Sequence, residues 1–250
     1  MIVAVTLAAA ALSAGGAGAA APLALWVSPT HLALTPGGEA TIHVRAVPGA
    51  RLLLRTSVAG LTLDGRGRPQ IAPRRDAAGW LTLQPRSLLA GPNGARFVVT
   101  AHRAAGARPG DHTAIVLLTA TTLGRKGIAV AMRVGLVVTV RVGGRSIRRV
   151  EVVAARTRSA PGGGRLIALT VANRGERIES IGGARLAVTL VRRGRIMGRF
   201  RVPQRQLLPQ TRAVVAFRLR SSARGPVVAH VAIVRPDGRI AARAFRLRFD

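Results

Sequence analysis

The chain has 250 residues, 48% of them hydrophobic, so it is long and apolar enough to bury one large core or two smaller ones. It has no cysteine, which excludes disulfides, thiolate metal sites and cysteine catalysis. Its 39 basic and nine acidic residues give a formal net charge of +30, and this charge must lie on the surface because an unpaired buried arginine is costly.

Residues 1–21 are typical of a secretory signal peptide. An apolar run, Ile2–Leu12, is followed by small residues, and Ala17–Ala19 fits the small-x-small cleavage pattern. We therefore expect an exported protein with a secreted or extracytoplasmic, cell-envelope localisation. The alternative is an uncleaved membrane anchor, although this apolar run is shorter than the ~20 residues that a span needs.

Residues 22–143 contain short apolar runs separated by turn signals. The predicted strands are 23–28, 31–34, 39–47, 51–58, 61–63, 80–83, 96–101, 112–123 and 130–142. The last run has Val, Met or Leu at every second position from Val130 to Val142, while Arg133, Gly135 and Arg141 occupy the other parity. Such a period of two places one set of side chains in the core. We expect a hairpin loop at Gly124–Gly127 and an immunoglobulin-like β-sandwich.

Residues 144–250 repeat this pattern after a flexible joint at Gly143–Ser146. The predicted strands are 147–156, 165–172, 185–191, 195–202, 213–219, 227–234 and 240–249. The fold class is therefore all-β: two tandem immunoglobulin-like antiparallel β-sandwiches, 22–143 and 144–250, after the signal peptide.

Titratable residues in this chain do not form a recognisable catalytic or metal-binding pattern. Asp111 is interpreted as a turn residue that bonds the local backbone, next to His112 at a strand start. Glu176 and Glu179 are expected on an exposed loop with local ion pairs. We predict no enzyme, no cofactor and no metal site. The two tryptophans, Trp26 and Trp80, are interpreted as core anchors rather than ligand-stacking residues.

Arginines on the polar parity of strands and in hairpin loops predict a polyanion-binding surface, because guanidinium groups bind phosphate and carboxylate. The candidate residues are Arg192, Arg193, Arg195, Arg218, Arg220, Arg246 and Arg248. The alternative is an ordinary solvated face of an arginine-rich protein. Nucleic acid is a disfavoured ligand, because the chain carries an export signal, has only five Phe and two Trp, and shows no DNA-reading helix.

The first half resembles the N-terminal domain of the WxL-interacting protein family. The matching stretches are WVSPTHLALTPGGEATIHVRA, WLTLQPRSLLAG and RPGDHTAIVLLTA with VAMRVGLVVTV. The resemblance implies a cell-surface protein that binds peptidoglycan and a WxL partner. The same order of turns and strands is similar to that of periplasmic pilus chaperones, which also consist of two sandwiches.

The second half resembles a CARDB-type adhesion module. The matching stretches are LIALTVANRGERIESIGGARLAVTLV and QLLPQTRAVVAFRLR. This resemblance implies an immunoglobulin-like fold and a role in adhesion.

These observations predict an exported, non-enzymatic cell-envelope binding or adhesion protein. Its Arg-rich strands would capture an anionic cell-wall polymer, peptidoglycan or an envelope protein partner, with membrane contact only through an uncleaved signal or lipid headgroups. The alternative is a periplasmic pilus-type chaperone that donates a strand to a partner subunit. The oligomeric state is left open.

Overall fold

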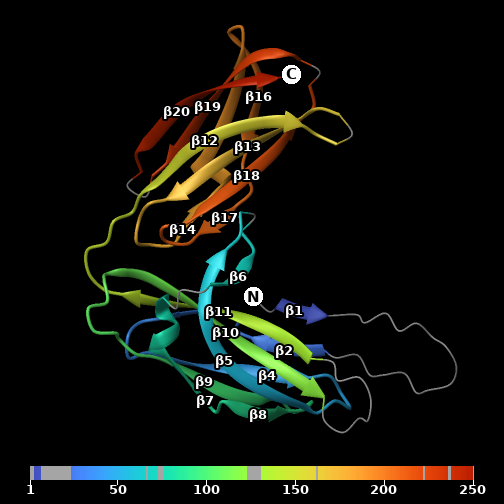
Figure 1. Cartoon of the computed structure of the whole chain (residues 1–250), viewed down its shortest axis with the longest axis vertical. Helices are drawn as coiled ribbons and strands as arrows, with labels where there is room; N and C mark the ends of the chain where they lie inside the picture. Colours follow the sequence, from blue (N-terminus) through green and yellow to red (C-terminus); the bar gives the residue numbers. More distant parts are fainter. Residues whose placement is uncertain are drawn as a thin grey trace, which may run out of the picture. The chain divides into compact units, whose positions relative to one another are not determined.

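The structure, a computed structural model, divides the chain into two compact units, each a β-sandwich (Figure 1). It describes residues 3–6, 24–65, 67–72, 76–122, 131–161, 163–221, 223–235 and 238–249. The first unit comprises Met1–Leu61, Ile71–Arg108 and His112–Gly143. The second comprises Thr62–Gln70, Pro109–Asp111 and Gly144–Asp250. Within the described residues, no helix is long and apolar enough to cross a membrane.

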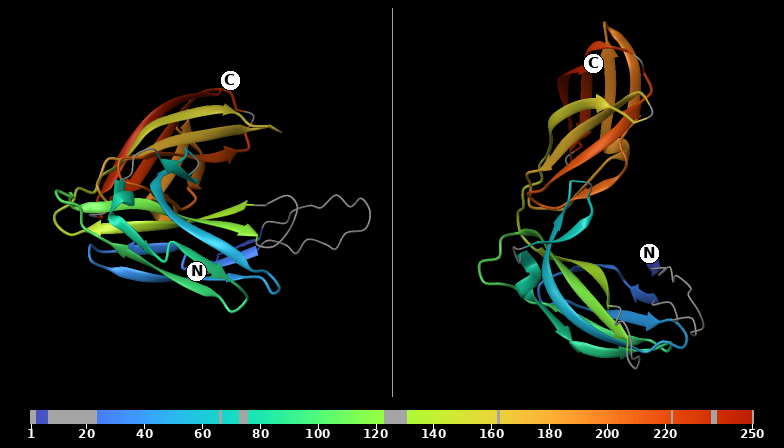
Figure 2. Two further views of the ribbon diagram at one scale, coloured as in Figure 1. Left: turned by 60° about the horizontal axis from the view of Figure 1, so that its bottom comes forward. Right: turned by 45° about the vertical axis from the view of Figure 1, so that its right-hand side comes forward.

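Two sheets form the first sandwich. One sheet has the strand order β1 (Val3–Thr6), β2 (Ala24–Ser28), β4 (Glu39–Ala46), β9 (Ala95–Ala101), β7 (Leu81–Gln84). The other has the order β3 (His31–Leu34), β11 (Ala131–Val142), β10 (Gly110–Thr122), β5 (Leu52–Leu63), β6 (Pro69–Ala72), and β8 (Ser87–Ala90) also pairs with β5. In the left view of Figure 2, green β10 and β11 lie in a layer above blue β2 and β4. A short 3-10 helix, η1 (Asp76–Trp80), precedes β7.

The alternation predicted for 130–142 is confirmed over the described part of β11. Met132, Val134 and Leu136 are buried, as are the next three residues of the same parity. Arg133 and Gly135 on the other parity are exposed. All of these apolar side chains except that of Val142 join the core between the two sheets, where each fully buried aliphatic residue stabilises the fold by roughly 1.5–3 kcal/mol.

The N-terminal segment of the first sandwich contributes to both sheets. β2 pairs antiparallel with β4, and the chain then crosses at Pro29 and Thr30 into the opposite sheet. There β3 pairs in parallel with β11. One short stretch therefore contributes strands to both layers.

Three sheets form the second sandwich. The first has the order β12 (Val150–Ser159), β13 (Arg165–Asn173), β18 (Arg212–Leu219), and the second β16 (Arg195–Arg201), β15 (Leu186–Arg192), β19 (Gly225–Val234), β20 (Ile240–Phe249). A short pair, β14 (Glu179–Ile181) with β17 (Arg205–Leu207), and the 3-10 helix η2 (Gly183–Arg185) complete it. Ile167, Leu190 and Phe249 lie at the centre of its core. The predicted all-β fold of two immunoglobulin-like sandwiches is confirmed.

Several strand boundaries differ from the predicted ones. Residues 51–58 and 61–63 form the single strand β5, and the strand predicted from Ile147 begins at Val150. The strands β1, β6, β8, β14 and β17 were not predicted. The loop predicted at 124–127 and most of the signal peptide lie outside the described residues, so the signal peptide stays a prediction.

Candidate functional site

The edge of β11 is only partly paired within the described residues. The pairing with β3 covers only Val137–Val140. Within the described part of the chain, the leading half of β11, 131–136, has β10 on one side and no strand on the other. An unpaired strand edge is a template for pairing with another chain.

The backbone groups at this open edge follow from the register. The N–H of Val137 donates to the carbonyl of Thr30, on the β3 side, at 3.0 Å. Because backbone groups alternate sides along a strand, the N–H and C=O groups of Gly135 and Arg133 point to the same side. The core-facing Met132 and Val134 keep the strand in place while these groups are presented.

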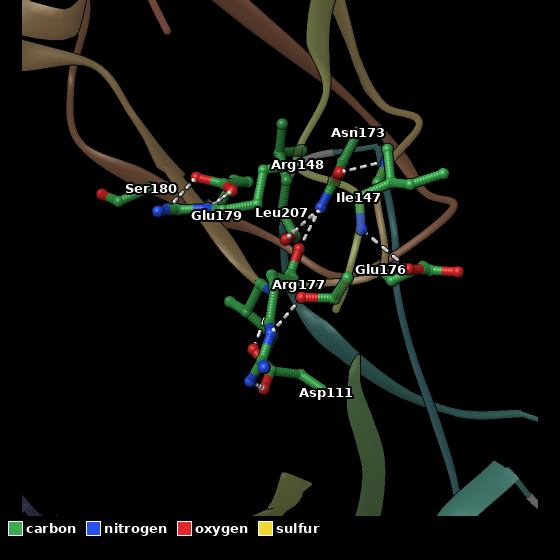
Figure 3. A network of polar contacts seen from close by, with 12 residues as sticks. Asp111, Ile147, Arg148, Asn173, Glu176, Arg177, Glu179, Ser180 and Leu207 are labelled. Carbon is green, nitrogen blue, oxygen red and sulfur yellow. Dashed lines mark hydrogen bonds and ion pairs between the residues drawn. The ribbon is translucent and has the colours of Figure 1, made fainter. Parts of the chain in front are cut away.

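A second cluster of polar residues lies in the second unit around Asp111 (Figure 3). The Asp111 carboxylate accepts hydrogen bonds from the Ile178 N–H at 2.9 Å and from Nη1 of Arg177 at 3.2 Å. Its own N–H donates to the Glu176 carbonyl at 2.7 Å. The interpretation of Asp111 as a turn residue did not predict these contacts, which join it to residues more than 60 positions away.

Gly110 allows this close approach. Its φ is +146°, and a Cβ at this position would lie 2.6 Å from the Glu176 carbonyl oxygen. A residue with a side chain would therefore displace the Glu176 backbone, to which the Asp111 N–H donates.

Glu179 and Asn173 form the buried part of the same cluster (Figure 3). Nε and Nη2 of Arg148 donate to the Glu179 carboxylate, whose side chain is 1% exposed. Asn173, fully buried, donates from Nδ2 to the carbonyls of Arg177 and Leu207. The prediction that Glu179 lies on an exposed loop is wrong. These bonds satisfy buried polar groups and hold the loop, which is a structural role.

Asp76 and His112 form a hydrogen-bonded pair in the first unit. The carboxylate of Asp76 lies 2.9 Å from Nδ1 of His112 and accepts the Thr113 N–H at 2.7 Å. Nε2 of the histidine faces the Arg108 carbonyl at 2.9 Å, and the ring of Trp80 lies 4.6 Å away, centroid to centroid. Both histidine nitrogens face backbone or carboxylate oxygens, so the pair anchors η1 to the start of β10.

The seven predicted polyanion-binding arginines do not share one face. Arg192, Arg193 and Arg195 meet at the β15–β16 hairpin. Exposed Arg246 and Arg248 lie on β20, in the same sheet. The other two belong to the opposite layer: Arg218 lies on β18, where it donates to the carbonyls of Pro161 and Gly163, and Arg220 directly follows that strand. Arg192, Arg193 and Arg195 therefore lie together, whereas the other four are distributed over β20 and the end of β18.

Neither tryptophan has a wholly buried position. Trp80 packs partly against the first core. Trp26 is half-buried and lies under the guanidinium of Arg45, 5.3 Å from the ring centroid, so its interpretation as a core anchor is wrong. No group of three or more His, Cys, Asp or Glu residues that could hold a metal ion occurs among the described residues.

Comparison with known proteins gives matches only among solved structures. No family model and no curated protein matches the sequence. The Escherichia coli chaperone DraB is 11% identical, with 91% of this chain and 99% of that chain covered and a TM-score of 0.46. The Pseudomonas aeruginosa CupB2 chaperone is 13% identical, with 88% and 99% covered and a TM-score of 0.44. The Salmonella enterica SafA pilin–SafB chaperone complex gives 10% identity, 92% and 99% coverage and a TM-score of 0.46.

These matches correct two expectations. The resemblances to WxL-interacting and CARDB modules are wrong, because the similar solved structures named above are those of chaperones, one of them in complex with a pilin. The predicted adhesion function, with capture of an anionic wall polymer or peptidoglycan by Arg-rich strands, is overturned by the same finding.

Proposed function

We propose that this chain is an extracytoplasmic, non-enzymatic protein that binds a protein partner by strand pairing at the open half of β11. This is the alternative suggested by the sequence: a pilus-type chaperone that donates a strand to a partner subunit. The observation that supports it is the short pairing of β3, which leaves the edge of 131–136 without a strand among the described residues.

Strand pairing suits this edge on physical grounds. An incoming strand gains main-chain hydrogen bonds to the N–H and C=O groups of Arg133 and Gly135, and side-chain contacts supply specificity. The exposed arginine on the open half also discourages pairing between two copies of this chain, because like charges would face each other. A partner with an unpaired strand of low positive charge fits these conditions.

The same geometry supports one class of partner. An incomplete β-sheet protein that lacks one strand exposes apolar surface and unpaired backbone groups, so it gains most from a donated edge. Among the solved structures of similar fold, one contains a pilin bound to its chaperone. We infer that a strand-deficient envelope subunit of this kind is the partner.

Arg133→Pro is the most selective test. Proline removes the N–H that points to the open edge but leaves the bonds of β11 to β10 in place, and edge positions tolerate proline. The full chain, tagged and expressed in its own cells, is isolated with its bound envelope proteins as wild type, Arg133→Pro and Arg133→Ala.

We expect Arg133→Pro to lose a subunit that the wild type retains, and Arg133→Ala, which keeps the N–H, to retain it. Hydrogen exchange on the purified complex should show slowed exchange at the amides of Arg133 and Gly135. Equal retention of the subunit by the proline and alanine variants, or unchanged exchange at both amides, would overturn the proposal. Unfolding curves of the free variants show whether the proline variant is folded.

A further inference from the structure

The outer face of the β2–β4–β9 sheet contains a hollow of about 570 Å³ that the strand-pairing function does not use. Its side-chain walls are Trp26 from β2, His43 and Arg45 from β4, and Arg96 from β9. Strand register explains this grouping, because Trp26 is opposite Arg45 and His43 is opposite Arg96. Cross-strand neighbours have Cβ atoms about 5 Å apart, so the four side chains meet on one face.

A tight turn closes one end of the hollow. Asn93 and Gly94 line it just before β9. The N–H of Gly94 donates to the Gly91 carbonyl at 3.1 Å, and its φ of +83° is one that glycine adopts without strain. A Cβ on Gly94 would lie 3.4 Å from the Val44 carbonyl oxygen, so the turn packs closely on β4.

The charge of the hollow is positive and uncompensated within the described residues. No acidic side chain lines it, and none of the ion pairs between described residues includes Arg45 or Arg96. Glu39 on the same strand is four residues from His43, roughly 13 Å along β4. The two guanidinium groups are therefore available to a ligand oxyanion.

The aromatic side chain of Trp26 sets a second requirement for a ligand, besides negative charge. The Arg45 guanidinium lies over the Trp26 ring, which orients a donor fork beside a flat apolar surface. Pockets of this kind combine one apolar wall with a few polar groups that fix orientation.

We propose that this hollow binds a small ligand in which a carboxylate or phosphate group is attached to a flat apolar body. The oxyanion pairs with Arg45 and Arg96, and the flat body packs on Trp26. The site is separate from the open edge of β11, since it lies in the other sheet of the first sandwich.

Ligand binding in the hollow can be measured by the fluorescence of Trp26. Because the chain has two tryptophans, the full-length Trp80→Phe protein has Trp26 as its single indole. It is titrated with benzoate, phenyl phosphate, inorganic phosphate and the neutral benzamide. We expect saturable changes with benzoate or phenyl phosphate, at least about tenfold weaker binding of inorganic phosphate, and no saturation with benzamide. Comparing benzoate with phenyl phosphate identifies the preferred oxyanion.

Two arginine variants and a matched control complete the test. In the same background, Arg45→Gln and Arg96→Gln should each raise Kd at least about tenfold. Arg55→Gln, an exposed arginine on β5 in the opposite sheet, should leave Kd within about twofold. Calorimetric titration repeats the comparison without relying on the indole signal.

Three results would overturn the proposal. The first is unchanged affinity in both pocket variants, and the second is an equal loss in Arg55→Gln, which would show general charge attraction. The third is binding of benzamide or inorganic phosphate as tight as that of phenyl phosphate. Circular dichroism of each variant separates loss of binding from loss of fold.

Discussion

Arg148 binds Glu179 through two parallel hydrogen bonds, 2.6 Å from Nε and 2.9 Å from Nη2. Arg148 precedes β12, and Glu179 opens β14, so the pair joins segments 31 residues apart. The Glu179 side chain is 1% exposed, and a second guanidinium, that of Arg185, is 3.7 Å away. A carboxylate this deeply buried requires such partners, because an uncompensated charge in a protein interior is strongly destabilising.

Arg148→Ala should therefore lower the free energy of unfolding by about 2 kcal/mol, with Arg185 compensating part of the loss. The matched control is Arg149→Ala, whose side chain is 66% exposed and lies 3.5 Å from Glu151; it should change stability by less than about 0.5 kcal/mol. Urea unfolding of the three proteins measures both values. Equal losses in the two variants would contradict a buried role for Glu179.

Replacing Asn173 by alanine or by aspartate should destabilise the protein. Its Nδ2 donates to two carbonyls, and its Oδ1 accepts the Gly175 N–H at 2.9 Å. Asn173→Asp places an oxygen against both carbonyls, so we expect a loss of about 3 kcal/mol, and about 2 kcal/mol for Asn173→Ala. Gln204→Ala, whose exposed amide donates to the Ser180 hydroxyl, serves as the control in thermal unfolding. A smaller loss for the aspartate than for the alanine variant would rule out this account.

Asp76→Ala should loosen the start of β10. The carboxylate accepts the Thr113 N–H, so its removal exposes that amide, and we expect exchange of the amide to be roughly tenfold faster. The amide of Leu118, further along the same strand, should be unaffected. Stability should fall by about 1 kcal/mol, because the carboxylate is 42% exposed. Unchanged exchange at Thr113 would show that the contact does not hold this strand end.

Glu151 gives a prediction for pH dependence. A hydrogen bond from Arg174 and the nearby charge of Arg149 hold the pKa of the Glu151 carboxyl below its ordinary value of 4.5. A lowered folded-state pKa contributes stability above the ordinary value and loses it as pH falls through the folded-state pKa. The wild type should therefore exceed Glu151→Gln by roughly 0.5 kcal/mol near pH 7, and by progressively less as pH falls below 4.5 through the folded-state pKa. Urea unfolding at neutral and at acid pH measures this difference in stability. A difference that grew as pH fell would contradict the prediction.

Local periodicity was enough to predict the long strands. The alternation in β11 gave the correct core face because side chains at every second position share a sheet surface, whatever the rest of the chain does. The three-residue strands β14 and β17 have no periodicity of their own. Their pairing arises from the loop around Asn173, and no local pattern reveals that loop's partners.

The polar clusters depended on contacts that sequence spacing does not show. Asp111 lies in a turn-like Pro-Gly-Asp stretch, yet its partners are Arg177 and Ile178. Trp26 alternates in step with core residues of β2, but its parity faces outward, toward Arg45. The arginines of the second half were distributed by strand order over two layers, which composition alone cannot separate.

The short length of β3 affects how the length of the unpaired edge of β11 can change. The chain leaves β2 after Ser28, and β3 pairs with β11 only from Val137 onward. The position of the crossing at Pro29 and Thr30 therefore determines how many backbone positions of β11 have no partner strand among the described residues. An insertion that allowed β3 to begin earlier would pair these backbone positions with β3 without altering any residue of β11. If the proposed strand pairing holds, changes in this linker would alter the length of strand that a partner can add without changing the side chains of β11.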